Sequence, residues 1–251
     1  MQLPTDPIAL GAIASLLAGT ATGLGAIPVL LGGNFGRRTL DIMLGFAGGV
    51  MLAASAFSLL IPALDLSGAW ITAFGFALGG IFVHVADKYI PHEHEVKGHE
   101  GPPTNLSRIW LIVLAITIHN FPEGLAVGVA FGTGDTGAGL TIALAIGLQN
   151  IPEGLAVAMP LVREGYSRGR AAGYALLSGL VEPIGGILGV FVVSFSRFLL
   201  PYGLAFAAGA MVFIVSDEMV PESHSGGFAR AATAGLMLGF IVMMILDTSL
   251  G

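Results

Sequence analysis

Cysteine is absent from the 251-residue chain, and charged side chains are scarce. Without cysteine the protein has no disulfide framework, no thiolate metal site and no cysteine nucleophile. Charged residues make up 10% of the chain, against roughly 25% in soluble domains. Ten basic and sixteen acidic side chains are too few to cover a soluble protein of this length. The shortage of charge therefore favours a membrane protein.

A basic surface is missing as well. The net charge is −6 and the isoelectric point is near 5.4, which excludes nucleic acid as a partner. No Lys or Arg precedes the first apolar run, so we do not expect a signal peptide. Apolar residues, in contrast, make up 55% of the chain, and glycine is abundant at 38 residues. Transmembrane helices tolerate glycine well.

Long apolar segments predict membrane-spanning helices. A spanning helix needs about 20 mostly apolar residues, whereas a barrel strand has only ~10 residues of alternating polarity. We expect an all-α polytopic membrane protein that forms a single transmembrane domain over residues 1–251. Its eight expected spans are 8–31, 42–62, 69–90, 107–131, 139–162, 170–194, 203–221 and 230–248.

Basic residues are distributed unevenly between the two sets of loops. Nine Lys and Arg residues lie in the loops after the first, third, fifth and seventh spans, and only Arg197 lies in the other set. Because loops rich in Lys and Arg stay in the cytoplasm, we expect both termini outside it. The loop 91–106 is then cytoplasmic.

A nine-residue motif occurs twice, thirty residues apart, with seven identical positions. Each copy lies near the middle of its span, and consecutive spans run antiparallel, which is typical of transporters with a central site between inverted repeats. A further intramembrane carboxylate, Glu182, precedes Pro183. The polar residues of the two copies are His119, Asn120 and Glu123, and Gln149, Asn150 and Glu153.

These polar side chains form a candidate metal site. An ionisable group at the bilayer centre costs ~3 kcal/mol or more and marks a functional site by default. The alternative is a hydrogen-bonded network that only fixes the packing. One imidazole with several carboxylate and amide oxygens suits zinc first, and then iron, manganese or cadmium. Met51 is either a soft ligand on the second span or an ordinary core residue.

Two further groups of polar residues lie toward the cytoplasmic side. The loop is either a flexible tract that collects or senses metal or a merely solvated loop, and it contains His92, Glu93, His94, Glu95 and His99. The end of the seventh span is either an exit-side relay or an ordinary helix end, and it contains Asp217, Glu218, Glu222 and His224.

The paired motifs, the eight spans and the His-bearing loop resemble the ZIP (Zrt/Irt-like) divalent-metal transporters, in their bacterial GufA-like branch. The resemblance implies inverted three-helix repeats around central helices 4 and 5, a homodimer and transport toward the cytoplasm by an elevator-type motion. It places the transport site at the seven polar residues above together with Met51. It also places Ser58 and Asp65 on the entrance side.

One position departs from the pattern that the resemblance implies. Relatives that hold two adjacent metal ions have an aspartate where this chain has Asn150. Three glutamates and one dication leave a net charge of −1, whereas two dications leave +1. We therefore expect one well-occupied metal and a second that binds weakly.

The expected function is transport of a divalent metal, zinc first, across a bacterial inner membrane. The metal is cargo, and no prosthetic group or bond-breaking chemistry is expected. The expected partners are metal ions, the lipid bilayer and a second copy of the chain. The alternatives are a passive metal channel and an intramembrane metal-dependent hydrolase, in which His and Glu would activate a water.

Overall fold

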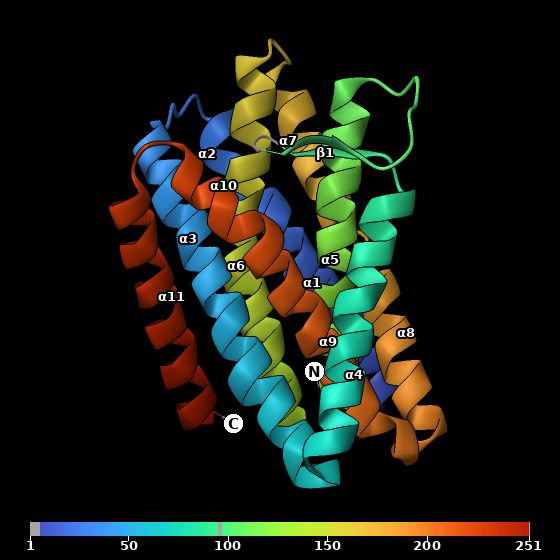
Figure 1. The fold of residues 1–251 in the computed structure, drawn as a ribbon. Coiled ribbons are helices and arrows are strands. Elements are labelled where there is room, and N and C mark those ends of the chain that lie inside the picture. Colours follow the sequence, from blue (N-terminus) through green and yellow to red (C-terminus); the bar gives the residue numbers. More distant parts are fainter. Residues whose placement is uncertain (1–5, 95–96, 251) are drawn as a thin grey trace.

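The computed structural model describes residues 6–94 and 97–250, so Glu95 lies outside the described residues. The expectation of a helical protein is confirmed, with one short β-hairpin in addition (Figure 1). The elements are α1 (Pro7–Gly25), α2 (Ile27–Leu30), α3 (Arg37–Ala53), η1 (Ala54–Leu60), α4 (Ile61–Tyr89), β1 (His92–His94), β2 (Gly98–Glu100), α5 (Arg108–Gly132), α6 (Thr136–Arg163), α7 (Arg168–Gly179), α8 (Glu182–Phe195), η2 (Arg197–Leu199), α9 (Leu200–Ile214), η3 (Val215–Met219), α10 (Val220–Ser225) and α11 (Ala229–Leu250).

Seven helical stretches among the described residues are long and apolar enough to cross a membrane. Six of them are 22 to 29 residues long, and the other, Arg37–Tyr89, has 53 residues. Within that stretch Gly68 has φ 74°, a conformation that side-chain-bearing residues rarely adopt. Figure 1 shows the chain turning back between α3 and α4, at the end of the bundle opposite the hairpin.

Several helices begin at residues whose side chains cap them. The Asp6 carboxylate accepts hydrogen bonds from the amides of Ile8 and Ala9 at the start of α1. Asp135 accepts one from the Gly137 amide at the start of α6, at 2.8 Å. Short polar residues at this position satisfy amides that have no partner inside the helix. The side chains of Asp6 and Asp135 therefore stabilise the starts of α1 and α6.

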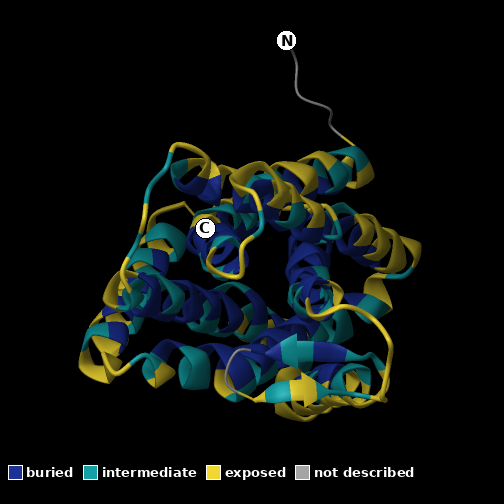
Figure 2. Cartoon of the chain, turned by 90° about the horizontal axis from the view of Figure 1, so that it is seen from above, coloured by how far each residue is buried: buried dark blue, intermediate teal, exposed yellow. Residues whose placement is uncertain are grey.

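The four helix pairs with the closest contacts divide into two groups, and α3 of one group also packs on α6 of the other. In one group α1 packs on α6 and α5 packs on α8; in the other, α3 packs on α11 and α4 packs on α9. Glycine allows this closeness: a β-carbon on Gly124 would collide with the carbonyl of Glu182, and one on Gly154 with that of Thr22. Figure 2 shows the buried residues on the inward faces of the helices.

The loop between α4 and α5 forms an antiparallel β-hairpin in which His92 lies opposite Glu100. The hairpin lies over one side of an end of the bundle (Figures 1 and 2). The two His residues of β1 are buried. This ordered hairpin was not predicted from the sequence, where the segment was expected to be a flexible or solvated loop. Its two strands have three residues each.

Candidate metal site

The predicted site residues lie on three helices of one group. His119, Asn120 and Glu123 are on α5, Gln149, Asn150 and Glu153 are on α6, and Glu182 begins α8. Glu153 is 8% exposed, and the other carboxylates and amides of the set are completely buried. Such burial of polar groups is costly unless a partner satisfies them.

The helix that carries Glu182 is broken at this residue, which the sequence analysis did not predict. The expected span 170–194 is divided into α7, which ends at Gly179, and α8, which begins at Glu182. Glu182 therefore lies in the first turn of α8, where the positive end of the helix dipole stabilises a carboxylate. Pro183 follows it and stabilises the helix start.

Asn150 binds two oxygens through its amide nitrogen. Nδ2 donates to Glu182 Oε1 at 2.6 Å and to the carbonyl of Ala18 at 2.8 Å. Because a carbonyl oxygen only accepts, the nitrogen of Asn150 must face Ala18. Gln149 Nε2 in turn donates to Asn150 Oδ1 at 3.3 Å. These bonds link α6 to α1 and α8, and they leave the oxygen as the only atom of Asn150 that can bind a metal.

Several buried oxygens of the set have no hydrogen-bond partner among the described residues. They are both carboxylate oxygens of Glu123, one oxygen each of Glu153 and Glu182, Asn120 Oδ1 and Gln149 Oε1. The three carboxylates also repel one another electrostatically. Buried acceptors of this kind are the ligands that a divalent cation would satisfy.

His119 contacts residues of η3 and the hairpin. Its Nε2 contacts Glu218 of η3, and His94 of β1 contacts the same carboxylate oxygen at 3.0 Å. The rings of His94 and His119 stack with their centroids 5.7 Å apart. His94, His119 and Glu218 thus form one group that could hold a metal ion.

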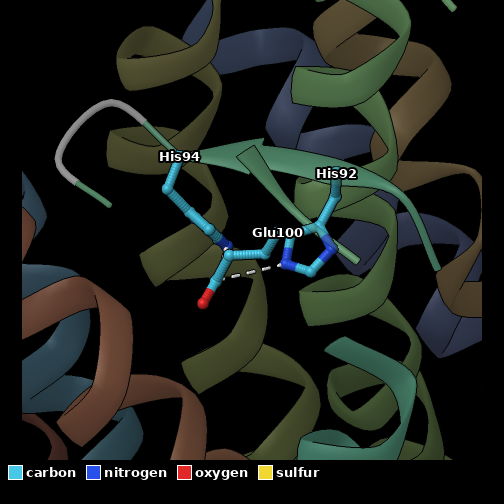
Figure 3. Close-up of side chains that lie close together, drawn as sticks. All are labelled: His92, His94 and Glu100. Atoms are coloured by element: carbon cyan, nitrogen blue, oxygen red, sulfur yellow. Dashed lines mark ion pairs between the residues drawn. The ribbon is translucent and has the colours of Figure 1, made fainter. Parts of the chain in front are cut away.

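A second such group lies on the hairpin itself. His92 and His94 approach Glu100 with nitrogen–oxygen distances of 3.5 and 3.4 Å. Figure 3 shows the three side chains together beneath the hairpin. Burial lowers the pKa of His94 to about 4, even though Glu218 favours its charged form. At neutral pH its imidazole is therefore unprotonated and has a lone pair for a cation.

A third group combines Asp87 with Asp217 and Glu218. Asp87, near the end of α4, was not among the predicted ligands, because a lone carboxylate near a helix end gives no pattern in the sequence. Among the described residues, the three groups of clustered His, Asp and Glu ligands all lie at the hairpin end. The carboxylate oxygens of Glu123, Glu153 and Glu182 do not lie as close to one another as the ligand atoms of those three groups.

A cavity of about 150 Å³ connects the middle of the bundle with the hairpin end. His119 and Glu153 line it from the helices of the site, and Glu93 and His94 line it from the hairpin. Arg108, at the start of α5, pairs with both Glu93 and Glu164 near this opening. The hairpin therefore borders the cavity that leads from the site to the hairpin end of the bundle.

Other predicted residues lie on other elements. Met51 is completely buried in the hydrophobic core, on α3. Ser58, within the π-helical turn η1, donates a hydrogen bond to Asp247 of α11, a residue that sequence reasoning missed. Asp65 is exposed.

The remaining candidates lie near the hairpin end. His99 is exposed, with Nε2 3.3 Å from the carbonyl oxygen of Pro102. His224 Nε2 lies 3.0 Å from the hydroxyl of Thr233. Glu222 lines the cavity, and Lys97 pairs with Asp217.

The sequence is also similar to known proteins, which is evidence independent of the site geometry. The sequence profile described as "ZIP Zinc transporter" matches residues 91–247. "Zinc transporter GufA" of Myxococcus xanthus is 52% identical, over 96% of this chain and 99% of its own length. "Zinc transporter ZIPB" of Bordetella bronchiseptica is 48% identical, over 92% and 78%. "Zinc transporter ZIP11" of Homo sapiens is 39% identical, over 92% and 94%.

Proposed function

The chain belongs to the ZIP zinc transporter family, and we propose that it carries Zn²⁺ across the membrane through the buried oxygens of α5, α6 and α8. It is a multi-pass membrane transporter and not an enzyme. The observation that carries the site is the set of fully buried carboxylate and amide oxygens without hydrogen-bond partners. Cd²⁺, Fe²⁺ and Mn²⁺ are further candidate cargoes of the same donor set.

We propose eight membrane crossings, with Arg37–Tyr89 crossing twice. The break at Gly68 and the reversal of direction in Figure 1 support this count. Each of the two arms exceeds the ~20 residues that one crossing needs. The opposed copies of the motif on α5 and α6 are then the centre of an inverted repeat.

The hairpin end is the cytoplasmic end in this proposal. Basic residues stand at the first or second position of four helices that begin there, namely Arg37 of α3, Arg108 of α5, Arg168 of α7 and Arg230 of α11 (Figure 1). Positive charge is retained on the cytoplasmic side of membranes. Both termini then lie outside the cytoplasm, and the bacterial relatives support an inner-membrane location.

We propose one firmly bound ion per chain. Asn150 Nδ2 donates a hydrogen bond to Glu182 Oε1 at 2.6 Å, which partly satisfies this carboxylate without a cation. The three carboxylates and one dication together give the site a net charge of −1. A second dication would make that net charge positive. Met51, which is buried on α3, stays a predicted soft ligand.

Transport takes place by an elevator-type motion in this proposal. The group α1, α5, α6, α7 and α8 carries the ion past the group α3, α4, α9 and α11. The His119, Glu218 and His94 ligands lead from the site to the hairpin, where metal is collected or sensed on the cytoplasmic side. Ser58, Asp65 and Asp247 lie on the entrance side, and assembly as a homodimer stays a prediction.

Zinc flux into proteoliposomes tests the proposed function. We expect Glu123→Gln and Glu153→Gln to lose both flux and bound zinc while the protein stays folded. Asp6→Asn is the matched control, because it removes one carboxylate far from the site and asparagine still caps α1. Flux that survives both Glu substitutions would refute the site. Flux that does not saturate would favour a passive channel over a carrier.

A further inference from the structure

Two glycines mark the point where α1 crosses the end of α7. A β-carbon on Gly19 would collide with the carbonyl oxygen of Gly179, and a β-carbon on Gly179 would collide with that of Gly19. The contact is therefore reciprocal. Three residues after each glycine the chain carries Thr22 on α1 and Glu182 on α8.

The neighbouring helices α5 and α6 also approach these two residues through glycines. Gly124 of α5 packs against the backbone of Glu182, and Gly154 of α6 packs against the backbone of Thr22. Each of these glycines directly follows the glutamate of its motif. Thr22 thus occupies, beside one copy of the motif, the place that Glu182 occupies beside the other.

The two side chains also lie at matching places on the crossing. The hydroxyl oxygen of Thr22 would be 2.7 Å from a β-carbon on Gly179, and Cβ of Glu182 would be 3.3 Å from a β-carbon on Gly19. Glu182 therefore faces α1, which carries Thr22, and Thr22 faces the end of α7, three residues before Glu182. The sequence motifs did not reveal this, since threonine and glutamate show no similarity in a repeat search.

The hydroxyl of Thr22 is completely buried and has no hydrogen-bond partner among the described residues. Thr72 and Thr117, in contrast, donate to the carbonyl four residues earlier. For Thr22 that carbonyl belongs to Ala18, and it accepts the amide of Asn150 instead, at 2.8 Å. A buried hydroxyl without a partner is unfavourable, so its oxygen is free to bind a ligand beside the site.

We propose that Thr22 Oγ1 is a further ligand of the transported divalent cation, a neutral oxygen at the counterpart of the Glu182 position. The inference rests on the proposed function of the midplane site. A hydroxyl adds an oxygen ligand for the metal without adding charge, so the net charge of three carboxylates and one dication stays the same. As a hard oxygen donor it favours Zn²⁺ over the softer Cd²⁺.

Replacing Thr22 by cysteine tests the proposal with a spectroscopic signal. The chain contains no cysteine, so the thiol of Thr22→Cys is the only one in the purified protein. We expect a ligand-to-metal charge-transfer band in the ultraviolet when Cd²⁺ is added, because a thiolate on the ion binds cadmium directly. The matched control is Thr72→Cys, which places a thiol at another buried threonine, on α4. It should show no band.

Transport kinetics give the second measurement. Thr22→Val keeps the shape and removes the hydroxyl, and we expect about a tenfold rise in KM for Zn²⁺ with a much smaller rise for Cd²⁺. Thr22→Ser keeps the hydroxyl and should restore zinc KM.

The outcomes separate this inference from the proposed function. A missing cadmium band in Thr22→Cys, or equal changes for both metals in Thr22→Val, would overturn the ligand role. Should Thr22→Val not fold, the cadmium band of Thr22→Cys still decides. Glu123→Gln in the same vesicles tests the site itself: if it transports normally, the proposed function fails, whatever Thr22 does.

Discussion

At the scale of single residues, the proposal of one bound ion per chain depends on Asn150. Its amide nitrogen donates to Glu182 and Ala18, so one carboxylate oxygen of the site already accepts a hydrogen bond from a neutral donor. The sequence predicted Asn150 as a metal ligand. The structure adds that only its oxygen remains for that role, and this oxygen faces Gln149 at 3.3 Å.

Asn150→Asp should raise the metal content of the purified protein from one zinc per chain toward two. The substitution removes the donor to Glu182 and adds a fourth carboxylate, so two dications leave the site neutral. Elemental analysis after zinc loading measures the ratio. Asn150→Ala is the matched control, since it removes the amide donor to Glu182 without adding a carboxylate. Two firmly bound zinc ions in the unchanged protein would contradict this account.

At the scale of helices, glycine and proline determine where the site forms. Gly124 and Gly154 bring α5 onto α8 and α6 onto α1, and Pro183 stabilises the start of α8 at Glu182. The sequence shows only that glycine is abundant, which is typical of transmembrane helices. It did not identify the pairs, because each contact joins residues that are far apart in the sequence.

Gly154→Ala should destabilise the protein by roughly 1–3 kcal/mol, since the added methyl group collides with the backbone of α1 at Thr22. The decrease in the melting temperature of the detergent-solubilised protein measures the effect. Gly173→Ala provides the contrast. Its β-carbon would meet nothing within 4 Å, and alanine is the better helix former by about 1 kcal/mol. Equal effects of the two substitutions would contradict the packing argument.

The same scale shows what the sequence can predict and what it cannot. Hydropathy and the repeated motif predict the helical class and the polar set on α5 and α6, because both depend on short-range patterns. The break at Glu182, the hairpin around His92 and His94, and the partners Asp87 and Asp247 depend on contacts across the fold. No local pattern encodes those contacts.

At the scale of the whole molecule, the proposed elevator-type motion moves one helix group against the other, and the hairpin lies where it bears on both. The hairpin contacts both groups: Glu93 pairs with Arg108 of α5, and Lys97 pairs with Asp217 of η3. These contacts hold it over the cavity that leads to the site. Motion of one group against the other must therefore break one set of hairpin contacts.

A cross-link between the groups should stop zinc flux. Met43 of α3 and Ile151 of α6 line one apolar pocket, so a bifunctional thiol reagent can join Met43→Cys to Ile151→Cys. In the control, Ile42→Cys and Leu238→Cys join α3 to α11 inside one group, since both residues line the same pocket. Because the chain has no cysteine of its own, the reagent reacts only at the chosen pairs. Full flux through the protein cross-linked between α3 and α6 would contradict an elevator-type motion.

The most direct test of the central claim is to locate zinc in the protein by anomalous diffraction at the zinc edge. We predict the main peak among Glu123, Glu153 and Glu182, at the ~2.0–2.2 Å that zinc–carboxylate bonds have. Further peaks at the hairpin ligands would agree with the proposed route. Zinc at the hairpin alone, with none between α5, α6 and α8, would contradict the account.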